Sequence, residues 1–148
     1  MSPRPLLPPT SGLPPLRLWP LVLQYGARAL VELCLARIEF ARLEVVTIPA
    51  RNAAMRAQHG KAEPTASHLA TLAWIAYAVP RVARRLPFRS DCLVQALAAQ
   101  RWLANRGMAG EIVIGAERPG EVFGAHAWVV CCGQTVTGGD TTRYTVLI

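Results

Sequence analysis

Cys92 is placed where a cysteine side chain can act as a nucleophile. The run that follows it, 92–105, is dominated by Ala and Leu and predicts a helix, with Ser90 or Asp91 as the cap at its start. The N–H groups and the dipole at the start of a helix stabilise negative charge, which favours the thiolate form. Asp91 would disfavour the thiolate if it pointed inward, but as the N-cap it should face the helix end. Taken alone, the position also fits a buried structural thiol.

A predicted hairpin near the end of the chain changes this interpretation. Residues 125–131, Ala-His-Ala-Trp-Val-Val-Cys, suit a strand, and Gly133 is a natural turn residue. A three-residue loop over 132–134 would pair Cys131 with Thr135. A slip of this register by one residue would move every side chain to the other face.

In that register His126 lies directly across from Asp140. Directly opposed residues share a face and have Cβ atoms about 5 Å apart, close enough for a carboxylate to orient an imidazole. Cys92, His126 and Asp140 then form the set that nucleophilic acyl transfer requires. The thiolate attacks a carbonyl, the histidine gives a proton to the leaving amine, and the aspartate fixes the ring tautomer. We therefore predict a catalytic triad of these three residues.

The first half of the chain is expected to be helical. Apolar residues recur at helical spacing from 16 to about 46, which predicts one long helix or two short ones. Residues 50–64 are polar and are interpreted as a connector. Thr65 is the expected N-cap of a further helix that runs toward residue 86, with Pro80 kinking or restarting it.

After this region the predicted elements change in type. The helix over 92–105 should end at Gly107 in a left-handed conformation, and a turn-rich stretch covers 118–120. Four strands are expected at 111–114, 122–131, 135–139 and 144–148. Helices first and antiparallel strands last predict an α+β fold, in which a helical half precedes one helix packed on a small sheet. We expect one compact domain with a disordered proline-rich tail (1–15), a helical region (16–87) and a catalytic core (88–148).

The charge of the chain is concentrated in its first half. The chain has 148 residues and a formal net charge of +7. Residues 1–88 contain 11 Lys and Arg against 4 Glu, which leaves +7, and residues 89–148 contain 5 Arg against 5 acids, which leaves 0. This asymmetry indicates either an acidic partner of the first half or a solvated basic face. No nucleic-acid-binding motif accompanies the arginines, so nucleic acid is not an expected partner.

Targeting and cofactor signals are not recognised in the sequence. The apolar stretch 18–23 contains Pro20 and is too short for a signal core or a membrane span. We therefore expect a cytoplasmic protein with four free thiols, and we favour a soluble amphipathic helix over a membrane-surface helix. The cysteines lack C-x-x-C spacing and no nucleotide-binding glycine motif is found, so no metal or cofactor is expected.

Three motifs together resemble one protein family. The runs SDCLVQALAAQRWLANRG, EIVIGAERPGEVFGAHAWVV and GGD, over residues 88–140, resemble the transglutaminase-like leader peptidases of lasso-peptide biosynthesis. The resemblance implies a papain-like core with Cys92 as the nucleophile, His126 as the general base and acid, and Asp140 as the orienting carboxylate. It implies removal of the leader peptide from a ribosomally made precursor by acyl-enzyme hydrolysis.

The resemblance also implies partners. Some members carry a fused leader-recognition domain, but no hairpin pattern is seen before residue 87, so the stand-alone peptidase form is expected. That form depends on a separate leader-recognition protein, and an ATP-dependent macrolactam cyclase acts after it. Two other functions remain open: transfer of the acyl group to an amine, as in a crosslinking transglutaminase, and a catalytically silent module that presents the precursor.

Overall fold

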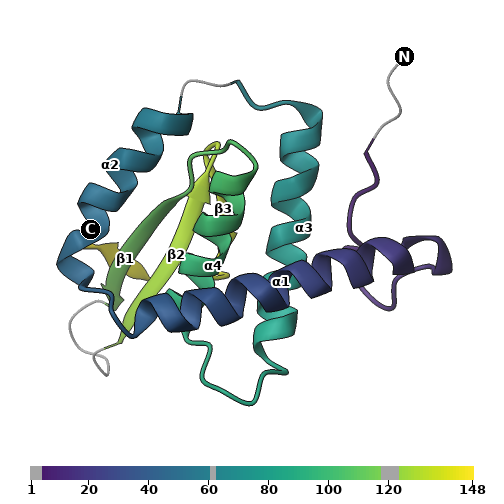
Figure 1. Ribbon diagram of the computed structural model, residues 1–148, viewed down its shortest axis with the longest axis horizontal. Helices are drawn as coiled ribbons and strands as arrows, with labels where there is room; N and C mark the ends of the chain where they lie inside the picture. Colours follow the sequence, from purple (N-terminus) through teal and green to yellow (C-terminus); the bar gives the residue numbers. More distant parts are fainter. Residues whose placement is uncertain (1–4, 61–62, 118–123) are drawn as a thin grey trace.

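The computed structural model describes residues 5–60, 63–117 and 124–148. Helices precede strands along the chain, so the predicted α+β class is confirmed (Figure 1). The described elements are η1 Leu16–Leu18, α1 Trp19–Phe40, η2 Val45–Thr47, α2 Ile48–His59, α3 Ala66–Ala83, α4 Cys92–Asn105, β1 Glu111–Glu117, β2 Ala125–Cys131, β3 Gln134–Thr137 and β4 Tyr144–Val146. None of the helices in these described ranges is long and apolar enough to cross a membrane.

Helix α2 occupies most of the segment that was predicted to be a polar connector, 50–64, so that prediction was wrong. Pro49 stands in the first turn of α2, where its missing N–H costs no hydrogen bond. Ile48 and Asn52 are the buried residues of this helix. Because Ile48 and Met55 are the only large apolar side chains of α2 apart from Pro49, its sequence pattern is weak, and specific contacts with the sheet and with α4 hold it in place.

Helix α3 begins as predicted. Thr65 accepts a hydrogen bond from the backbone N–H of His68 at 3.2 Å, and the His68 ring nitrogen Nδ1 accepts one from the Thr65 N–H at 3.2 Å. This reciprocal pair is a capping box, which satisfies N–H groups that the helix start leaves free. Pro80 lies inside the helix, which continues to Ala83.

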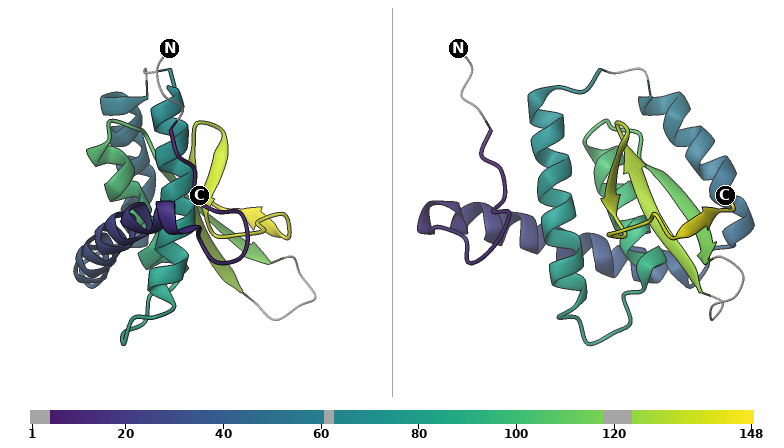
Figure 2. Two further views of the ribbon diagram at one scale, coloured as in Figure 1. Left: turned by 90° about the vertical axis from the view of Figure 1, so that its right-hand side faces the viewer. Right: turned by 180° about the vertical axis from the view of Figure 1, so that it is seen from behind.

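The four strands form one antiparallel sheet in the order β3-β2-β1-β4. Helix α4 contacts β1, β2 and β3, and the sheet lies to one side of the helices in the left view of Figure 2. The predicted turn at 118–120 and the predicted strand start at 122 fall outside the described residues. Because β3 and β4 stand at opposite edges, the segment 138–143 has to cross from one edge of the sheet to the other.

The turn between β2 and β3 is tighter than predicted. Cys132 and Gly133 both have positive φ, 52° and 72°, which marks the two-residue hairpin turn that fits the twist of the strands. Cys131 consequently pairs with Gln134 and not with Thr135. The prediction of a three-residue loop was therefore wrong.

An irregularity in the ladder then restores the predicted register for one pair. Between Val129 and Val130 the pairing shifts by one residue, so that Val129 stands opposite Thr137. The ladder ends at this pair, and the backbone of β3 does not continue to Asp140. The strand pairing therefore does not place Asp140 across from His126, as the predicted hairpin would have done.

The sheet and helices share one apolar core. It contains buried side chains from α1 to α4 and from the strands, among them Leu33, Ile48, Ile75, Leu97, Leu103 and Ile112. Tyr25 stacks on Trp74, with ring centroids 4.8 Å apart. The Trp74 ring nitrogen donates a hydrogen bond to the carbonyl of Leu6 at 2.8 Å, which attaches the described part of the proline-rich tail to α3.

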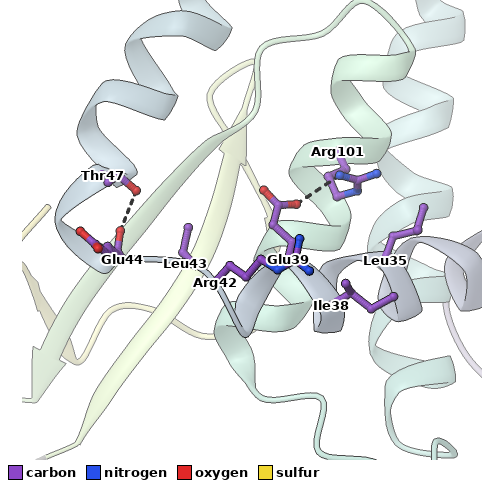
Figure 3. Close-up of a pocket in the computed structure, with 8 residues that line it drawn as sticks. All are labelled: Leu35, Ile38, Glu39, Arg42, Leu43, Glu44, Thr47 and Arg101. Atoms are coloured by element: carbon purple, nitrogen blue, oxygen red, sulfur yellow. Dashed lines mark hydrogen bonds and ion pairs between the residues drawn. The ribbon is translucent and has the colours of Figure 1, made fainter.

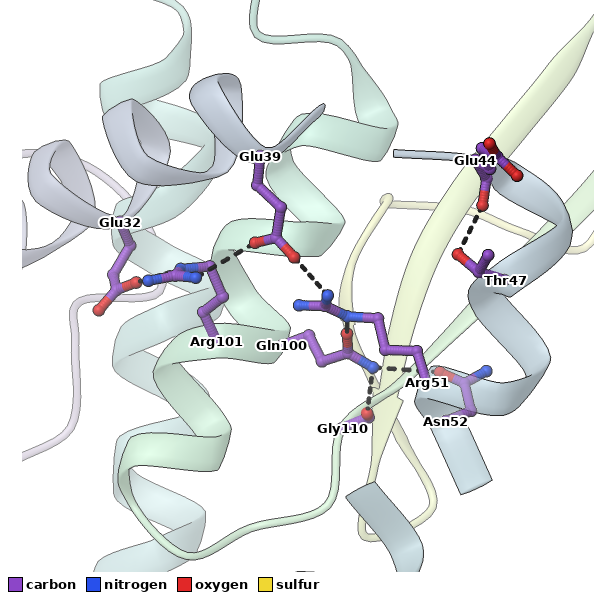
Figure 4. Close-up of polar contacts among 9 residues, drawn as sticks. All are labelled: Glu32, Glu39, Glu44, Thr47, Arg51, Asn52, Gln100, Arg101 and Gly110. Atoms are coloured by element: carbon purple, nitrogen blue, oxygen red, sulfur yellow. Dashed lines mark hydrogen bonds and ion pairs between the residues drawn. The ribbon is translucent and has the colours of Figure 1, made fainter. Parts of the chain in front are cut away.

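A chain of polar contacts joins α1 to α4 and α2 (Figure 4). Arg101 of α4 forms ion pairs with Glu32 at 3.3 Å and with Glu39 at 3.1 Å, both on α1. Arg51 of α2 reaches Glu39 and the side-chain oxygen of Gln100. Glu32 is only 1% exposed, and Arg101 together with Arg28, which lies 2.6 Å from it, neutralises a buried charge that would otherwise be costly.

The chain of contacts continues to the sheet. The Gln100 amide donates to Asn52 at 3.1 Å and to the Gly110 carbonyl at 2.9 Å. Asn52 in turn accepts from the N–H of Ile112 at 2.9 Å and donates to its carbonyl at 2.8 Å. The Asn52 side chain thus satisfies the backbone N–H and carbonyl of Ile112, as a neighbouring strand would. Strand β4 pairs with β1 only further along, at residues 115–117. These contacts fix α4, which carries Cys92, against the sheet.

Candidate active site

Cys92 is the first residue of α4, as predicted. Asp91 is the N-cap residue, but its carboxylate accepts no hydrogen bond from the start of the helix. It is exposed instead and lies 3.5 Å from Arg89. Asp91 therefore occupies the predicted N-cap position, but the expectation that its carboxylate would face the start of the helix was wrong. The uncapped N–H groups beside Cys92 remain available to a thiolate or an oxyanion.

His126 lies on β2 and its ring is held by a backbone carbonyl. The Nε2 atom is 2.7 Å from the carbonyl oxygen of Gly138. Because a carbonyl oxygen can only accept, Nε2 must carry the hydrogen of the neutral ring. The other ring nitrogen, Nδ1, is then the basic atom that can exchange a proton with a thiol.

Aromatic side chains surround the His126 ring. Tyr144 stacks on it with ring centroids 4.8 Å apart, and Trp128 lies on the same face of β2 at 5.9 Å. Gly115 stands opposite His126 in the sheet, and a Cβ there would lie 2.9 Å from the Trp128 ring and 3.0 Å from Tyr144. Because Gly115 has no side chain, the rings of Trp128 and Tyr144 can occupy this space.

Gly138 is required both for its conformation and for its size. Its φ of +103° is a value that L side chains rarely adopt. A Cβ added there would lie 2.4 Å from the Cβ of Trp128 and 3.1 Å from Nε2 of His126. Only glycine can therefore bring its carbonyl to the His126 ring in this backbone arrangement.

Cys92 and His126 line the same pocket, whose volume is about 470 Å³. Its other lining residues come from α3, α4, β3 and the loop after β3: Ala76, Pro80, Gln95, Thr135, Val136, Thr137, Gly138 and Gly139. No acidic or basic side chain is among these lining residues apart from the histidine. The Cys92 thiol forms no hydrogen bond within the described residues, so it is open to a substrate in the pocket.

Asp140 is not among the residues that line this pocket. Its carboxylate is exposed and accepts hydrogen bonds from Thr142, at 3.0 Å from the backbone N–H and at 2.7 Å from the hydroxyl. These hydrogen bonds lower the pKa of Asp140 below its ordinary value, so the group is charged at neutral pH. The role of Asp140 in catalysis stays a prediction.

The remaining cysteines lie away from the pocket. Burial raises the pKa of Cys131 to about 12, with a further contribution from its contact with Cys132, whose sulfur is 3.7 Å away. Cys131 therefore stays a protonated thiol and is a poor nucleophile. Cys34 is partly exposed on α1. Within 5–60, 63–117 and 124–148, no three His, Cys, Asp or Glu side chains are grouped so that they could hold a metal ion.

A larger hollow, of about 670 Å³, lies on the helical side of the molecule (Figure 3). Its lining comes from the end of α1, from the segment that leads to α2, and from α4: Leu35, Ile38, Glu39, Arg42, Leu43, Glu44, Thr47 and Arg101. Its lining contains no cysteine or histidine, so it offers neither a thiol nor an imidazole. The pocket around Cys92 is the candidate active site, because it combines a cysteine at a helix start with a histidine.

Sequence reasoning missed the residues that support the nucleophile and the base. Gly138 and Tyr144 contact His126 only because the segment 138–143 crosses the sheet. Gln95 could have been found from its spacing, since it follows Cys92 by three residues on a helix and so lies on the same face.

A family model described as Transglutaminase-like superfamily matches residues 34–148. This range begins within α1 and therefore includes α2 and α3 as well as the segment of the three motifs. Comparison with curated proteins and with solved structures gives no match for the chain.

Proposed function

Because the chain belongs to the transglutaminase-like superfamily, we propose that it is a cysteine peptidase that removes the leader from a ribosomally made lasso-peptide precursor. The observation that carries the proposal is the pocket shared by Cys92 and His126, with the thiol at an uncapped helix start. The choice of substrate is supported by the three motifs in residues 88–140, which resemble the leader peptidases.

In the first step of the proposed reaction the Cys92 thiolate attacks the carbonyl carbon of the scissile bond. A C–S bond forms, and the π electrons of the carbonyl group move to its oxygen. N–H groups at the start of α4 donate hydrogen bonds to this oxyanion and stabilise its negative charge. The protonated His126 ring gives its Nδ1 proton to the leaving amine as the C–N bond breaks. Water then attacks the acyl-enzyme, His126 takes its proton, and the C–S bond breaks to return the thiolate.

An amine in place of water would make the same site a transferase, so the acceptor has to be tested directly. The experiment incubates the protein with a precursor peptide and the recognition protein, with and without an added amine such as glycine methyl ester. Mass spectrometry distinguishes a free leader carboxylate from a leader amide. We expect the free acid as the main product. A predominant amide would favour the transferase, and an uncut precursor would favour the silent presenting module.

We further propose that the leader-recognition protein docks on the solvent side of α1. This side exposes large apolar residues: Leu23, Leu30, Val31, Leu35 and Ile38. Arg42 lies beside them and has no side-chain partner within the described residues, which suits an acidic partner. Dependence of the cleavage rate on the recognition protein in the same assay tests this docking. The released core peptide would then pass to the macrolactam cyclase.

Asp140→Asn is expected to slow cleavage about 10- to 1000-fold. Asparagine keeps an oxygen that can accept the hydrogen bonds from Thr142. It removes the negative charge with which Asp140 would offset the His126 imidazolium in the predicted triad. The matched control is Thr142→Val, which removes the 2.7 Å hydroxyl contact and leaves the charge. Steady-state rates of precursor cleavage test whether Asp140 takes part in catalysis. A loss of less than ten-fold for Asp140→Asn would contradict this role and would assign the orientation of the His126 ring to the Gly138 carbonyl alone.

A further inference from the structure

We propose that the side-chain amide of Gln95 is the second hydrogen-bond donor of the oxyanion hole at Cys92. The inference rests on the proposed peptidase function and concerns the same pocket. A tetrahedral intermediate needs donors aimed at the oxygen that becomes charged, and a helix start by itself offers only backbone N–H groups from one side.

The position of Gln95 on α4 brings its side chain to the pocket. Residues three apart on a helix are neighbours on one face, so Gln95 lies beside Cys92. Its side chain is half-buried and lines the pocket together with Cys92 and His126. It points back toward the helix start, because its Nε2 donates a hydrogen bond to the carbonyl of Ser90 at 2.9 Å.

That hydrogen bond fixes the amide and leaves one of its hydrogens unused. The NH₂ group of glutamine carries two hydrogens, and the contact with Ser90 uses one of them. Within the described chain no second acceptor is bonded to Nε2, so the other N–H is available to a substrate oxygen. A donor already held in place by the protein does not have to reorganise when the charge forms.

The competing explanation is structural. By binding the Ser90 carbonyl, Gln95 could simply hold the loop before α4 and so position Cys92. The two roles differ in what they do to the thiolate. A positioning role changes every reaction of Cys92, whereas an oxyanion donor acts only when a carbonyl oxygen becomes negatively charged.

The experiment compares wild-type protein with Gln95→Leu and Gln95→Met, both of which lack the N–H donors and add no charge beside Cys92. Two readouts are taken on the full chain: kcat and KM on the precursor, and the rate of alkylation of Cys92 by iodoacetamide as a function of pH. Alkylation consumes the thiolate but forms no oxyanion. We expect kcat to fall about 10²- to 10³-fold in both variants, with KM and the alkylation profile nearly unchanged.

An unchanged kcat in either folded variant would overturn the inference. A loss of alkylation rate equal to the loss of kcat would also overturn it and would assign Gln95 the positioning role. If Gln95→Leu does not fold, Gln95→Met, which keeps the length of the side chain without adding a charge, decides. Failure of the wild-type protein to cut the precursor is a separate result, which would overturn the proposed function itself.

Discussion

Cys92→Ala is expected to abolish precursor cleavage, with a loss on the order of 10⁴- to 10⁶-fold. The variant lacks the sulfur that would form the acyl-enzyme. Among the other residues that line the pocket, only the hydroxyls of Thr135 and Thr137 could attack a carbonyl, and an unactivated hydroxyl is a weak nucleophile. The fold should persist, because alanine is the best helix former and the Cys92 thiol forms no hydrogen bond within the described residues. Mass spectrometry of the precursor and a thermal melt measure the two effects.

The other cysteines provide the matched controls for this prediction. Alanine at Cys34, Cys131 or Cys132 should leave cleavage nearly unchanged, since none of the three lines the pocket. Cys131 is buried, so its replacement removes some packing but no reactive thiolate. Full cleavage by Cys92→Ala, or loss of cleavage in one of the controls with an unchanged melt, would refute the assignment of the nucleophile.

Gly138→Ala is expected to reduce cleavage on the order of 10³-fold and to lower the melting temperature. The added Cβ would lie 2.4 Å from the Cβ of Trp128, so the loop must move and take the Gly138 carbonyl away from His126. Without this acceptor the ring can adopt the other tautomer, in which Nδ1 carries the hydrogen and cannot take the proton of the thiol. Rates of precursor cleavage and a thermal melt measure the result.

The next residue is a close control for this change. Gly139 also has a positive φ, +65°, but a Cβ there would meet no atom within 4 Å. Gly139→Ala therefore carries a similar backbone strain without the clash, and we expect a loss of less than about ten-fold. Equal losses in the two variants would show that loop strain, and not the contact between the Gly138 carbonyl and His126, sets the rate.

Local signals in the sequence predicted the elements that carry the nucleophile and the base. The Ala- and Leu-rich run from Cys92 predicted α4 with the cysteine at its first residue, and Gly107 ends that helix with a φ of +74°. The alternation around His126 predicted β2. Both predictions depend on residues close together in the chain, where propensity and capping act directly.

Helix α2 shows why other elements could not be predicted in this way. Its sequence has too few large apolar residues for a clear helical stripe, and residues 50–64 were interpreted as a connector. What holds it are contacts with residues far along the chain: Asn52 with Ile112 of β1, and Arg51 with Gln100 of α4. No window of neighbouring residues contains both members of such pairs.

The sequence by itself therefore determined the fold class and the two elements from which Cys92 and His126 reach one pocket. The partner of the His126 ring was decided only by the tertiary structure. A two-residue turn and a shift in the ladder set the register of β3, and the crossing segment then brought the Gly138 carbonyl to Nε2, a contact between residues 12 apart. Asp140, predicted for that position from an unbroken hairpin, lies two residues further on. A hairpin register is fixed by side-chain packing across the whole sheet, and a sequence pattern within one hairpin does not contain that information.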